Sequence, residues 1–299
     1  MPSVGEQALS VIVPAYNEEH AVAGVVEEIR RVLNAAGCAF EVVVVDDGST
    51  DRTEARARGA GAEVVRHPEN RGYGAALKTG IRHARHPWLC ITDADGTYPN
   101  ARIPDLLAHA VEHGADMVVG SRTGAHVAIP LVRRPAKWAI TRLASMVAGE
   151  GIPDLNSGLR VTRRPALLPF FSLLPDGFSF TTTITLAMLS NGYSVAYVPV
   201  DYHHRVGRSK IRPIRDTLNF VQLILRIALY FAPLKVFLPL SATLALLAVA
   251  WGAFTKLVTG TVADVSTVVI VMSAVQVGVV GLLAELINRR LPSHFKQER

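Results

Sequence analysis

Cysteine is scarce in this chain, which holds two, Cys38 and Cys90, among 299 residues. Both stand between apolar neighbours, and small secreted folds held by disulfides need a denser cysteine framework. The sequence therefore predicts a protein of a reducing compartment without disulfides. The start of the chain lacks a basic head, and its first apolar run, 11–13, is too short for a secretory signal.

Several familiar catalytic patterns are also missing. The glycine-rich segment 70–74 does not complete Gly-x-Gly-x-x-Gly, because Leu77 stands at the last position, and it lacks the Gly-Lys-Ser/Thr of a P-loop. No Ser/His/Asp or Cys/His nucleophilic set is apparent. A glycine-rich loop that opens a helix can nevertheless receive a phosphate, so Arg71 and Gly72 are candidate ligands of a nucleotide.

Apolar residues, by contrast, are abundant at 49%, and the excess lies near one end. Segments 234–254 and 265–287 are nearly all apolar, and each has the roughly 20 residues that a helix needs to cross a hydrocarbon core. A buried core helix could explain one such run, but two in succession favour a transmembrane hairpin.

The formal net charge is +6, and the basic residues flank the apolar runs. Basic flanks on both sides of a hairpin predict that both termini are cytoplasmic and that only the turn near 256–264 lies outside. These charges cluster where an anionic membrane surface would lie, so we expect no nucleic-acid partner. The flanking residues are Arg205, Arg208, Lys210, Arg212 and Arg215 before the first run, and Arg289, Arg290, Lys296 and Arg299 after the second.

Strand and helix signals alternate up to about residue 120, which predicts an α/β fold with a mainly parallel sheet covered on both faces. In such sheets ligands bind beyond the carboxyl ends of the strands. The expected strands are 9–13, 41–45, 63–66, 88–92 and 116–119, with a return strand at 193–200. The expected helices are 18–35 after an Asn17 cap, 51–58, 75–84 and 103–112.

An acidic pair, Asp93 and Asp95, follows the apolar run 88–92 with Ala94 between them. Carboxylate oxygens suit hard divalent cations, and Mg²⁺ is usually held by one or two carboxylates plus substrate phosphates. The pair therefore predicts a site for Mg²⁺ or Mn²⁺ that carries a diphosphate.

Two more polar clusters fall at expected strand ends. In segment 46–51, Asp46, Asp47 and Ser49 could accept hydrogen bonds from a ribose or a base, or could form a turn that caps the next helix; both can hold together. The other cluster, 14–18, follows the first strand and includes Pro14, Ala15, Tyr16 and Glu18. The convergence of these clusters on one edge of the sheet is the main physical argument for a site.

Cations recur in the segments expected to be loops. Each is open to two interpretations, a solvated surface charge or a phosphate ligand. The last cluster stands just before the expected membrane surface, where a lipid phosphate would be presented, and this favours a ligand. The residues concerned are Arg122, Arg133, Arg134, Lys137, Arg160, Arg205, Arg208 and Lys210.

The remaining features concern the membrane-proximal part. Segment 211–231 has a helical apolar stripe with arginines beside it, typical of a helix in the membrane interface, although a core helix of the soluble domain is the alternative. We expect a cytoplasmic domain at 1–210, this helix at 211–231 and the hairpin at 232–299. In the second apolar run Ala274 and Gly278 form a small-xxx-small pair beside Gln276, which could pack helices within the hairpin or in a homo-oligomer.

Taken together, segments 11–19, 46–51, 70–74, 93–96 and 157–160 resemble glycosyltransferase family 2. More narrowly, the chain resembles the polyprenyl-phosphate glycosyltransferases related to dolichol-phosphate mannose synthase, over roughly residues 8–215. Segment 96–98 departs from the Leu/Gln-rich sequence common after the acidic motif, so the resemblance does not identify the donor sugar. The Gln-x-x-Arg-Trp signature of processive polysaccharide synthases is missing, which favours a single transfer.

The resemblance implies a GT-A fold and a set of roles for this chain's residues. Asp93 and Asp95 would hold the metal on the diphosphate. The nucleotide-binding set is Pro14, Ala15, Tyr16, Glu18, Asp46, Asp47, Ser49, Arg71, Gly72 and Ala94. Arg122, Arg134, Arg205, Ser209 and Lys210 would contact the diphosphate or the acceptor phosphate.

The expected reaction is the inverting transfer of one hexosyl unit from a UDP- or GDP-sugar to polyprenyl phosphate at the cytoplasmic membrane face. A phosphate monoester has a second pKa near 6 and is largely dianionic at neutral pH, so it needs no strong general base. The alternative is a membrane-anchored nucleotide-sugar-binding scaffold without catalysis. A sugar nucleotidyltransferase would want a Gly-rich basic loop after the first strand, where this chain has segment 14–17.

Overall fold

The computed structural model describes residues 7–123, 148–202, 232–260 and 265–290, with residues 142, 144–146, 222, 224–226 and 228–230 between them. The chain divides into two compact units, Met1–Phe220 and Val221–Arg299. Most of the expected interfacial helix 211–231 lies outside the described residues, so this helix and the domain limits around it stay predictions.

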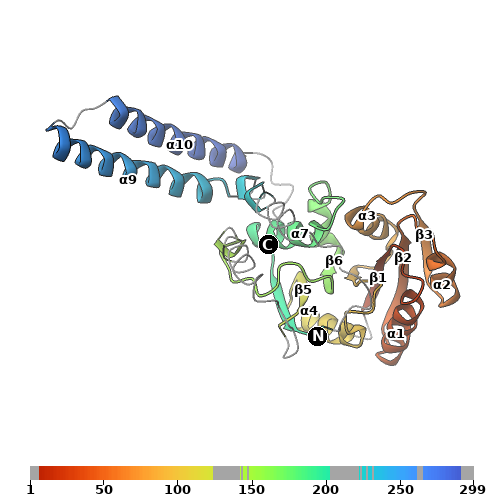
Figure 1. Ribbon diagram of the computed structural model, residues 1–299. Coiled ribbons are helices and arrows are strands. Elements are labelled where there is room, and N and C mark those ends of the chain that lie inside the picture. The colour runs from red at the N-terminus through yellow and green to blue at the C-terminus, as the bar shows by residue number, and fades with distance from the viewer. Residues whose placement is uncertain are drawn as a thin grey trace. The chain divides into compact units, whose positions relative to one another are not determined.

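The first unit is built on one seven-stranded sheet with the order β3-β2-β1-β4-β6-β5-β7 (Figure 1). The pairs β1–β2, β1–β4, β2–β3 and β5–β7 are parallel, and β6 runs antiparallel to both its neighbours. The expected mainly parallel sheet is confirmed. The strands are β1 (Ala8–Ala15), β2 (Ala39–Asp46), β3 (Glu63–Arg66), β4 (Trp88–Ile91), β5 (Met117–Ser121), β6 (Arg160–Arg163) and β7 (Val195–Pro199).

Helices cover both faces of this sheet. Alternate residues of β1 and β2, such as Val11 and Val44, share one apolar cluster with α1 (Val22–Ala35) and α4 (Ile103–Glu112). Val43 and Val45 face the other way and pack with Ala76 of α3 (Tyr73–His83). A strand buried on both faces must be apolar at successive positions, which explains the valine run of β2. The remaining helices of the unit are α2 (Thr53–Gly59), η2 (Asn100–Arg102), α6 (Arg164–Leu167), η4 (Leu168–Phe170) and α7 (Phe180–Ser190).

The expected Asn17 cap is wrong. The helix begins at Val22, with Ala21 at its N-cap and no side-chain cap. Asn17 instead has φ 57°, in the left-handed region, and its Oδ1 accepts a hydrogen bond from the backbone N–H of Thr50 at 2.9 Å. The residues before the helix therefore bond to the neighbouring loop, so the helix starts later than its apolar pattern indicates.

Strand β6 was not expected from the sequence. It has four residues, two of them arginines, and so lacks the apolar run that marks its neighbours. It inserts between β4 and β5, where Cys90 pairs with Val161 and Val118 pairs with the same residue from the other side. Its place depends on pairing with residues far away in the chain, which local pattern does not report.

The second unit contains two long apolar helices, α9 (Leu234–Thr259) and α10 (Val265–Arg290). The spans Leu234–Val258 and Val265–Ile287 are long and apolar enough to cross a membrane, and 11% of the most apolar part of each is buried. The small residues of α10 pack inside this hairpin: Ser241 Oγ donates to the Ala274 carbonyl at 2.8 Å, and a Cβ on Gly278 would lie 3.1 Å from Ser241 Oγ. Ala274 and Gly278 thus lie against α9 within the hairpin, and a role in a homo-oligomer stays a prediction.

Candidate active site

The loops after β1, β2 and β4 meet at one edge of the sheet. Ala15 at the end of β1 pairs in register with Asp46 at the end of β2. On the other side of β1, Ile12 pairs with Ile91, the last residue of β4, and Asp93 follows two residues later. The topology therefore brings the three polar clusters to the same edge.

The first two loops are bonded to each other through main-chain N–H groups and side chains. The N–H of Asn17 donates to Ser49 Oγ at 2.9 Å, and the N–H of Glu18 donates to Thr53 Oγ1 at 2.8 Å. Ser49 is buried, whereas Tyr16, which precedes Asn17 in sequence, is 38% exposed. Ser49 and Thr53 thus fix the backbone of the loop and leave the Tyr16 ring at the surface.

Asp46 is completely buried, but its two carboxylate oxygens differ. Oδ1 accepts the N–H of Ser49 at 3.0 Å. Oδ2 has no hydrogen-bond partner among the described residues, and Arg66 Nε lies 3.7 Å from it. A buried carboxylate oxygen without a hydrogen bond is costly unless a ligand supplies one. Asp46 therefore fits the part of a ligand-binding carboxylate.

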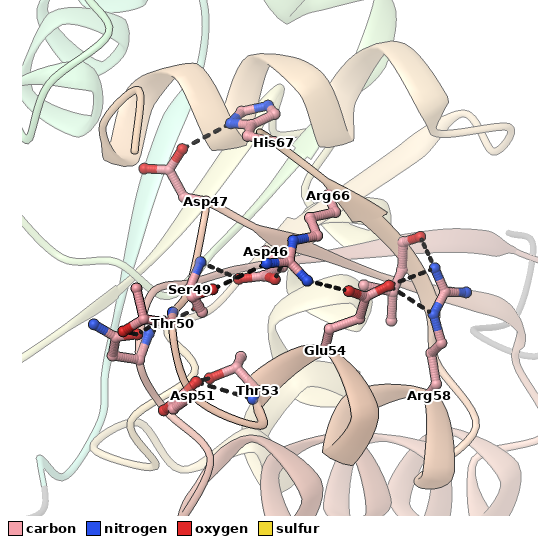
Figure 2. A network of polar contacts seen from close by, with 12 residues as sticks. Asp46, Asp47, Ser49, Thr50, Asp51, Thr53, Glu54, Arg58, Arg66 and His67 are labelled. Atoms are coloured by element: carbon pink, nitrogen blue, oxygen red, sulfur yellow. Dashed lines mark hydrogen bonds and ion pairs between the residues drawn. The ribbon is translucent and has the colours of Figure 1, made fainter. Parts of the chain in front are cut away.

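Asp47 bonds within the protein. Its Oδ1 accepts the N–H of Arg71 at 2.9 Å and lies 2.7 Å from Nδ1 of the buried His67, and its Oδ2 accepts the N–H of Gly72 at 2.8 Å. Figure 2 shows His67 and Asp47 pointing toward one another. Gly72 is the N-cap of α3 and has φ 102°, a conformation that favours glycine. Asp47 therefore holds the start of α3 against the end of β2.

The acidic pair after β4 is half-buried, with Ala94 buried between the two carboxylates. Asp93 Oδ1 accepts a hydrogen bond from the Tyr73 hydroxyl at 3.0 Å. Asp95 Oδ1 accepts from the N–H of Thr97 at 3.1 Å and from its hydroxyl at 2.6 Å. These bonds orient both carboxylates, whose oxygens are of the hard type that Mg²⁺ and Mn²⁺ prefer.

No group of three or more His, Cys, Asp or Glu side chains that could hold a metal was found in the described part of the chain. Two carboxylates alone would leave most coordination positions of a divalent cation open. Mg²⁺ sites commonly fill such positions with substrate phosphates and water. The donor set therefore fits a cation that arrives with a diphosphate.

Tyr73 stands at the first position of α3 and was missed as a site residue. Its ring stacks on Phe178 with centroids 5.5 Å apart, and Phe178 itself is 80% exposed. Burial and the charge of Asp93 raise the pKa of Tyr73 well above its ordinary value, so the phenol stays protonated and donates. An aromatic residue inside a glycine-rich segment at a helix start is the signal that could have pointed to it.

Arg122 forms a two-point pair with Asp154, another residue that sequence reasoning missed. Nε and Nη2 donate to the two carboxylate oxygens at 2.8 and 2.9 Å, and the N–H of Arg122 donates as well at 3.0 Å. Burial raises the pKa of Asp154, and the hydrogen bonds and charge of Arg122 more than offset this and lower it. Nη1 of Arg122 makes no hydrogen bond within the described residues, so a phosphate contact by this residue stays a prediction.

The interpretation of Arg160 as a solvated surface charge in a loop is wrong. It begins β6 and is completely buried. Other predicted contacts with phosphate cannot be placed, since Arg133, Arg134, Lys137, Arg205, Arg208, Ser209 and Lys210 lie outside the described residues.

The comparisons agree with this geometry. Residues 10–168 match the family model of glycosyl transferase family 2, and residues 232–289 match the GtrB C-terminal hairpin. The dolichyl-phosphate hexose transferase of Haloferax volcanii is 36% identical over 206 residues, which cover 69% of this chain and 87% of that protein. The dodecaprenyl-phosphate galacturonate synthase of Rhizobium johnstonii is 27% identical over 304 residues, covering 94% and 88%.

Among solved structures, glucosyl-3-phosphoglycerate synthase from Mycobacterium tuberculosis, in complex with Mn²⁺, uridine diphosphate and glucosyl-3-phosphoglycerate, has a TM-score of 0.58. The two chains are 23% identical, and the match covers 75% of this chain and 79% of that one. At this identity the likeness shows the fold alone, a GT-A-like sheet with flanking helices. By fold, motif order and sequence match, the chain belongs to glycosyltransferase family 2 and is a glycosyltransferase.

Proposed function

We propose that this glycosyltransferase moves one hexosyl residue from UDP- or GDP-hexose to polyprenyl phosphate at the cytoplasmic face of a membrane. The observation that carries the proposal is the edge of the sheet that holds both the acidic pair, Asp93 and Asp95, and the buried carboxylate of Asp46. Two relatives are named for transfer to dolichyl or dodecaprenyl phosphate, and one of them matches over 94% of this chain. This supports a lipid phosphate as acceptor.

The donor would bind across the ends of β1, β2 and β4. Asp93 and Asp95 would hold Mg²⁺ or Mn²⁺, which when bound stabilises charge on the departing nucleoside diphosphate. The buried Oδ2 of Asp46 would accept a hydrogen bond from the nucleoside, beside the exposed ring of Tyr16. Pro14, Ala15, Glu18 and Ala94 line the same edge in this proposal, while Ser49 and Asp47 hold its loops, the latter through Arg71 and Gly72.

The acceptor attacks without a protein base. An oxygen of the phosphate monoester attacks the anomeric carbon, the bond from that carbon to the diphosphate oxygen breaks, and the nucleoside diphosphate leaves with the electron pair. In-line displacement inverts the anomeric centre. The chain's task is then positioning and charge neutralisation. Nη1 of Arg122 is one group that could align the phosphate, and Arg134, Arg205, Ser209 and Lys210 are further predicted contacts.

The hairpin would anchor the enzyme where its lipid acceptor resides. Basic residues precede the first apolar run and follow the second, which favours cytoplasmic termini. A cytoplasmic site would also have direct access to nucleotide sugars. The rival hypothesis, a scaffold that binds a nucleotide sugar without transfer, predicts binding but no product.

A donor screen tests the proposal. Purified full-length protein is incubated with Mg²⁺ or Mn²⁺, a short polyprenyl phosphate and a panel of UDP- and GDP-hexoses, and released nucleotide and lipid product are measured. We expect one or a few donors to yield equal amounts of nucleoside diphosphate and glycosylated lipid. Binding of a donor without lipid-dependent nucleotide release across the panel would contradict the proposal and favour the scaffold.

A further inference from the structure

A fully buried arginine, Arg160, begins β6 and pairs in register with Ile91, two residues before Asp93. Its hydrogen bonds within the described residues go to neutral acceptors. Nε and Nη2 both donate to the carbonyl oxygen of Ser157, with Nε at 3.2 Å. Nη1 donates to the Thr181 carbonyl and to Thr185 Oγ1 of α7, each at 3.1 Å.

This arginine is unusual because it is not neutralised by an ion pair. No carboxylate lies within ion-pair distance of its guanidinium among the residues that the structure describes. Taking an unpaired charge out of water costs several kcal/mol even after the protein relaxes. Packing alone could be achieved by an apolar side chain of similar length at no such cost. The cost of burying this charge therefore indicates that Arg160 has a role beyond packing.

The carbonyl that Arg160 holds belongs to the turn that borders Asp93. Ser157 Oγ donates to the Gly120 carbonyl at 2.5 Å, and the N–H of Gly158 donates to the Tyr98 hydroxyl at 2.7 Å. Gly158 touches the acidic pair: a Cβ added there would lie 2.8 and 2.9 Å from the two carboxylate oxygens of Asp93. The backbone of this turn therefore limits the positions that the Asp93 carboxylate can adopt.

Asp93 is therefore held from two directions. The Tyr73 hydroxyl bonds to it at 3.0 Å, and the backbone at Gly158 limits where it can move. The second of these depends on where Arg160 holds the Ser157 carbonyl. Groups behind metal ligands commonly orient them, and their loss costs about 10–100-fold in metal affinity.

We propose that Arg160 is a positioning residue for the cation site, which acts by fixing the 157–158 turn against Asp93. This inference rests on the proposed function, since it assumes that Asp93 and Asp95 receive a cation with a nucleoside diphosphate. Gly158 contributes to the same positioning, because any side chain at this residue would displace the Asp93 carboxylate.

The test compares Mn²⁺ binding by full-length variants in the presence of UDP and of GDP, measured by the electron paramagnetic resonance of free Mn²⁺. Arg160→Met removes the charge and the hydrogen bonds at similar side-chain length. Gly158→Ala adds a Cβ next to the Asp93 carboxylate and so tests the steric limit directly. Arg163→Met is the matched control, because Arg163 lies on the same strand, is half-exposed and pairs with Asp116 at 3.7 Å. Thermal unfolding is measured on every variant.

We expect Arg160→Met and Gly158→Ala to weaken Mn²⁺ binding by roughly tenfold or more, and Arg163→Met to stay within about twofold of the unmodified protein. Arg160→Met with unchanged Mn²⁺ affinity, whatever its melting temperature, would overturn the proposal. If Arg160→Met does not fold, Gly158→Ala and Arg160→Lys decide: Mn²⁺ binding as tight as in the unmodified protein in both overturns it.

The outcome is separable from that of the proposed function. Unmodified protein that binds Mn²⁺ with nucleotide but transfers no sugar to lipid would refute the function and leave the role of Arg160 testable by binding. Unmodified protein that transfers sugar, alongside an Arg160→Met variant with intact Mn²⁺ affinity, would refute the positioning role alone.

Discussion

The hydroxyl of Tyr73, at the first position of α3, donates a 3.0 Å hydrogen bond to Oδ1 of Asp93, which follows β4. This bond links the glycine-rich loop to the acidic pair, two motifs 20 residues apart in the chain. The loop is held in turn by Asp47, so the ends of β2 and β4 share one bonded framework. The proposed cation site and the proposed nucleotide-binding loops are therefore expected to respond together to substitutions.

Tyr73→Phe tests this link. The variant keeps the ring that stacks on Phe178 but removes the hydrogen bond, so we expect kcat/KM to fall roughly tenfold and the Mn²⁺ concentration for half-maximal rate to rise. The control is Tyr197→Phe, because the buried Tyr197 hydroxyl has no hydrogen-bond partner in the described chain. Equal activity of Tyr73→Phe and unmodified protein at limiting Mn²⁺ would show that the bond does not serve the site.

Two adjacent aspartates are expected to behave differently. Asp46→Asn keeps an oxygen for the Ser49 N–H but removes the charge of the carboxylate, whose Oδ2 has, in the part of the chain that the structure describes, no hydrogen bond and only a 3.7 Å ion pair with the half-exposed Arg66. The KM for the donor should therefore rise roughly tenfold with little change in melting temperature. Asp47→Ala removes the acceptor of two backbone N–H groups and should lower the free energy of unfolding by about 3 kcal/mol. Donor KM values and denaturant unfolding measure the two effects, and the reverse pattern would contradict these assignments.

The Arg122–Asp154 pair should make stability depend on acid pH. Since Arg122 holds the pKa of Asp154 below its ordinary value, this stabilisation is fully present above the unfolded carboxyl pKa, about 3.9, and is lost as the pH falls through the lower folded value. Asp154→Asn should cost about 3 kcal/mol at neutral pH. Its unfolding free energy should also fall less steeply below pH 4 than that of the unmodified protein. Parallel pH profiles for the two proteins would contradict this.

Membrane orientation can be tested by cysteine labelling in intact cells. Both native cysteines are buried, so we expect them to react little with the maleimide, and labelling reports on the introduced cysteine. Lys256→Cys, near the end of α9, should react with an impermeant maleimide from outside. Glu112→Cys, exposed at the end of α4, should react only after permeabilisation. Labelling of Glu112→Cys in intact cells would reverse the proposed topology.

The sequence predicted those parts of the fold that have a local signal. The valine run of β2, the apolar helices of the hairpin and the acidic pair after β4 are readable because each is a continuous pattern of a few to about 20 residues. Strand β6 and the helix start at Val22 could not be predicted in this way, because they depend on pairing across the sheet and on hydrogen bonds between loops.

The site shows the same division. Asp46, Asp93 and Asp95 could be proposed from residue type and place at strand ends. Their partners could not, since Tyr73 meets Asp93 across 20 residues and Arg122 meets Asp154 across 32. Arg160 is the clearest failure, because an arginine after a Ser-Gly turn is typical of the surface, and only packing against α7 buries it.

The most direct test of the account is mass spectrometry of the lipid product made with the donor found in the screen. Unmodified protein should convert polyprenyl phosphate to a species heavier by one hexosyl unit, with one nucleoside diphosphate released for each. Asp93→Ala and Asp95→Ala should each lose this product at any Mg²⁺ or Mn²⁺ concentration. Full product formation by either variant would contradict the central claim that these carboxylates hold the cation on the departing diphosphate.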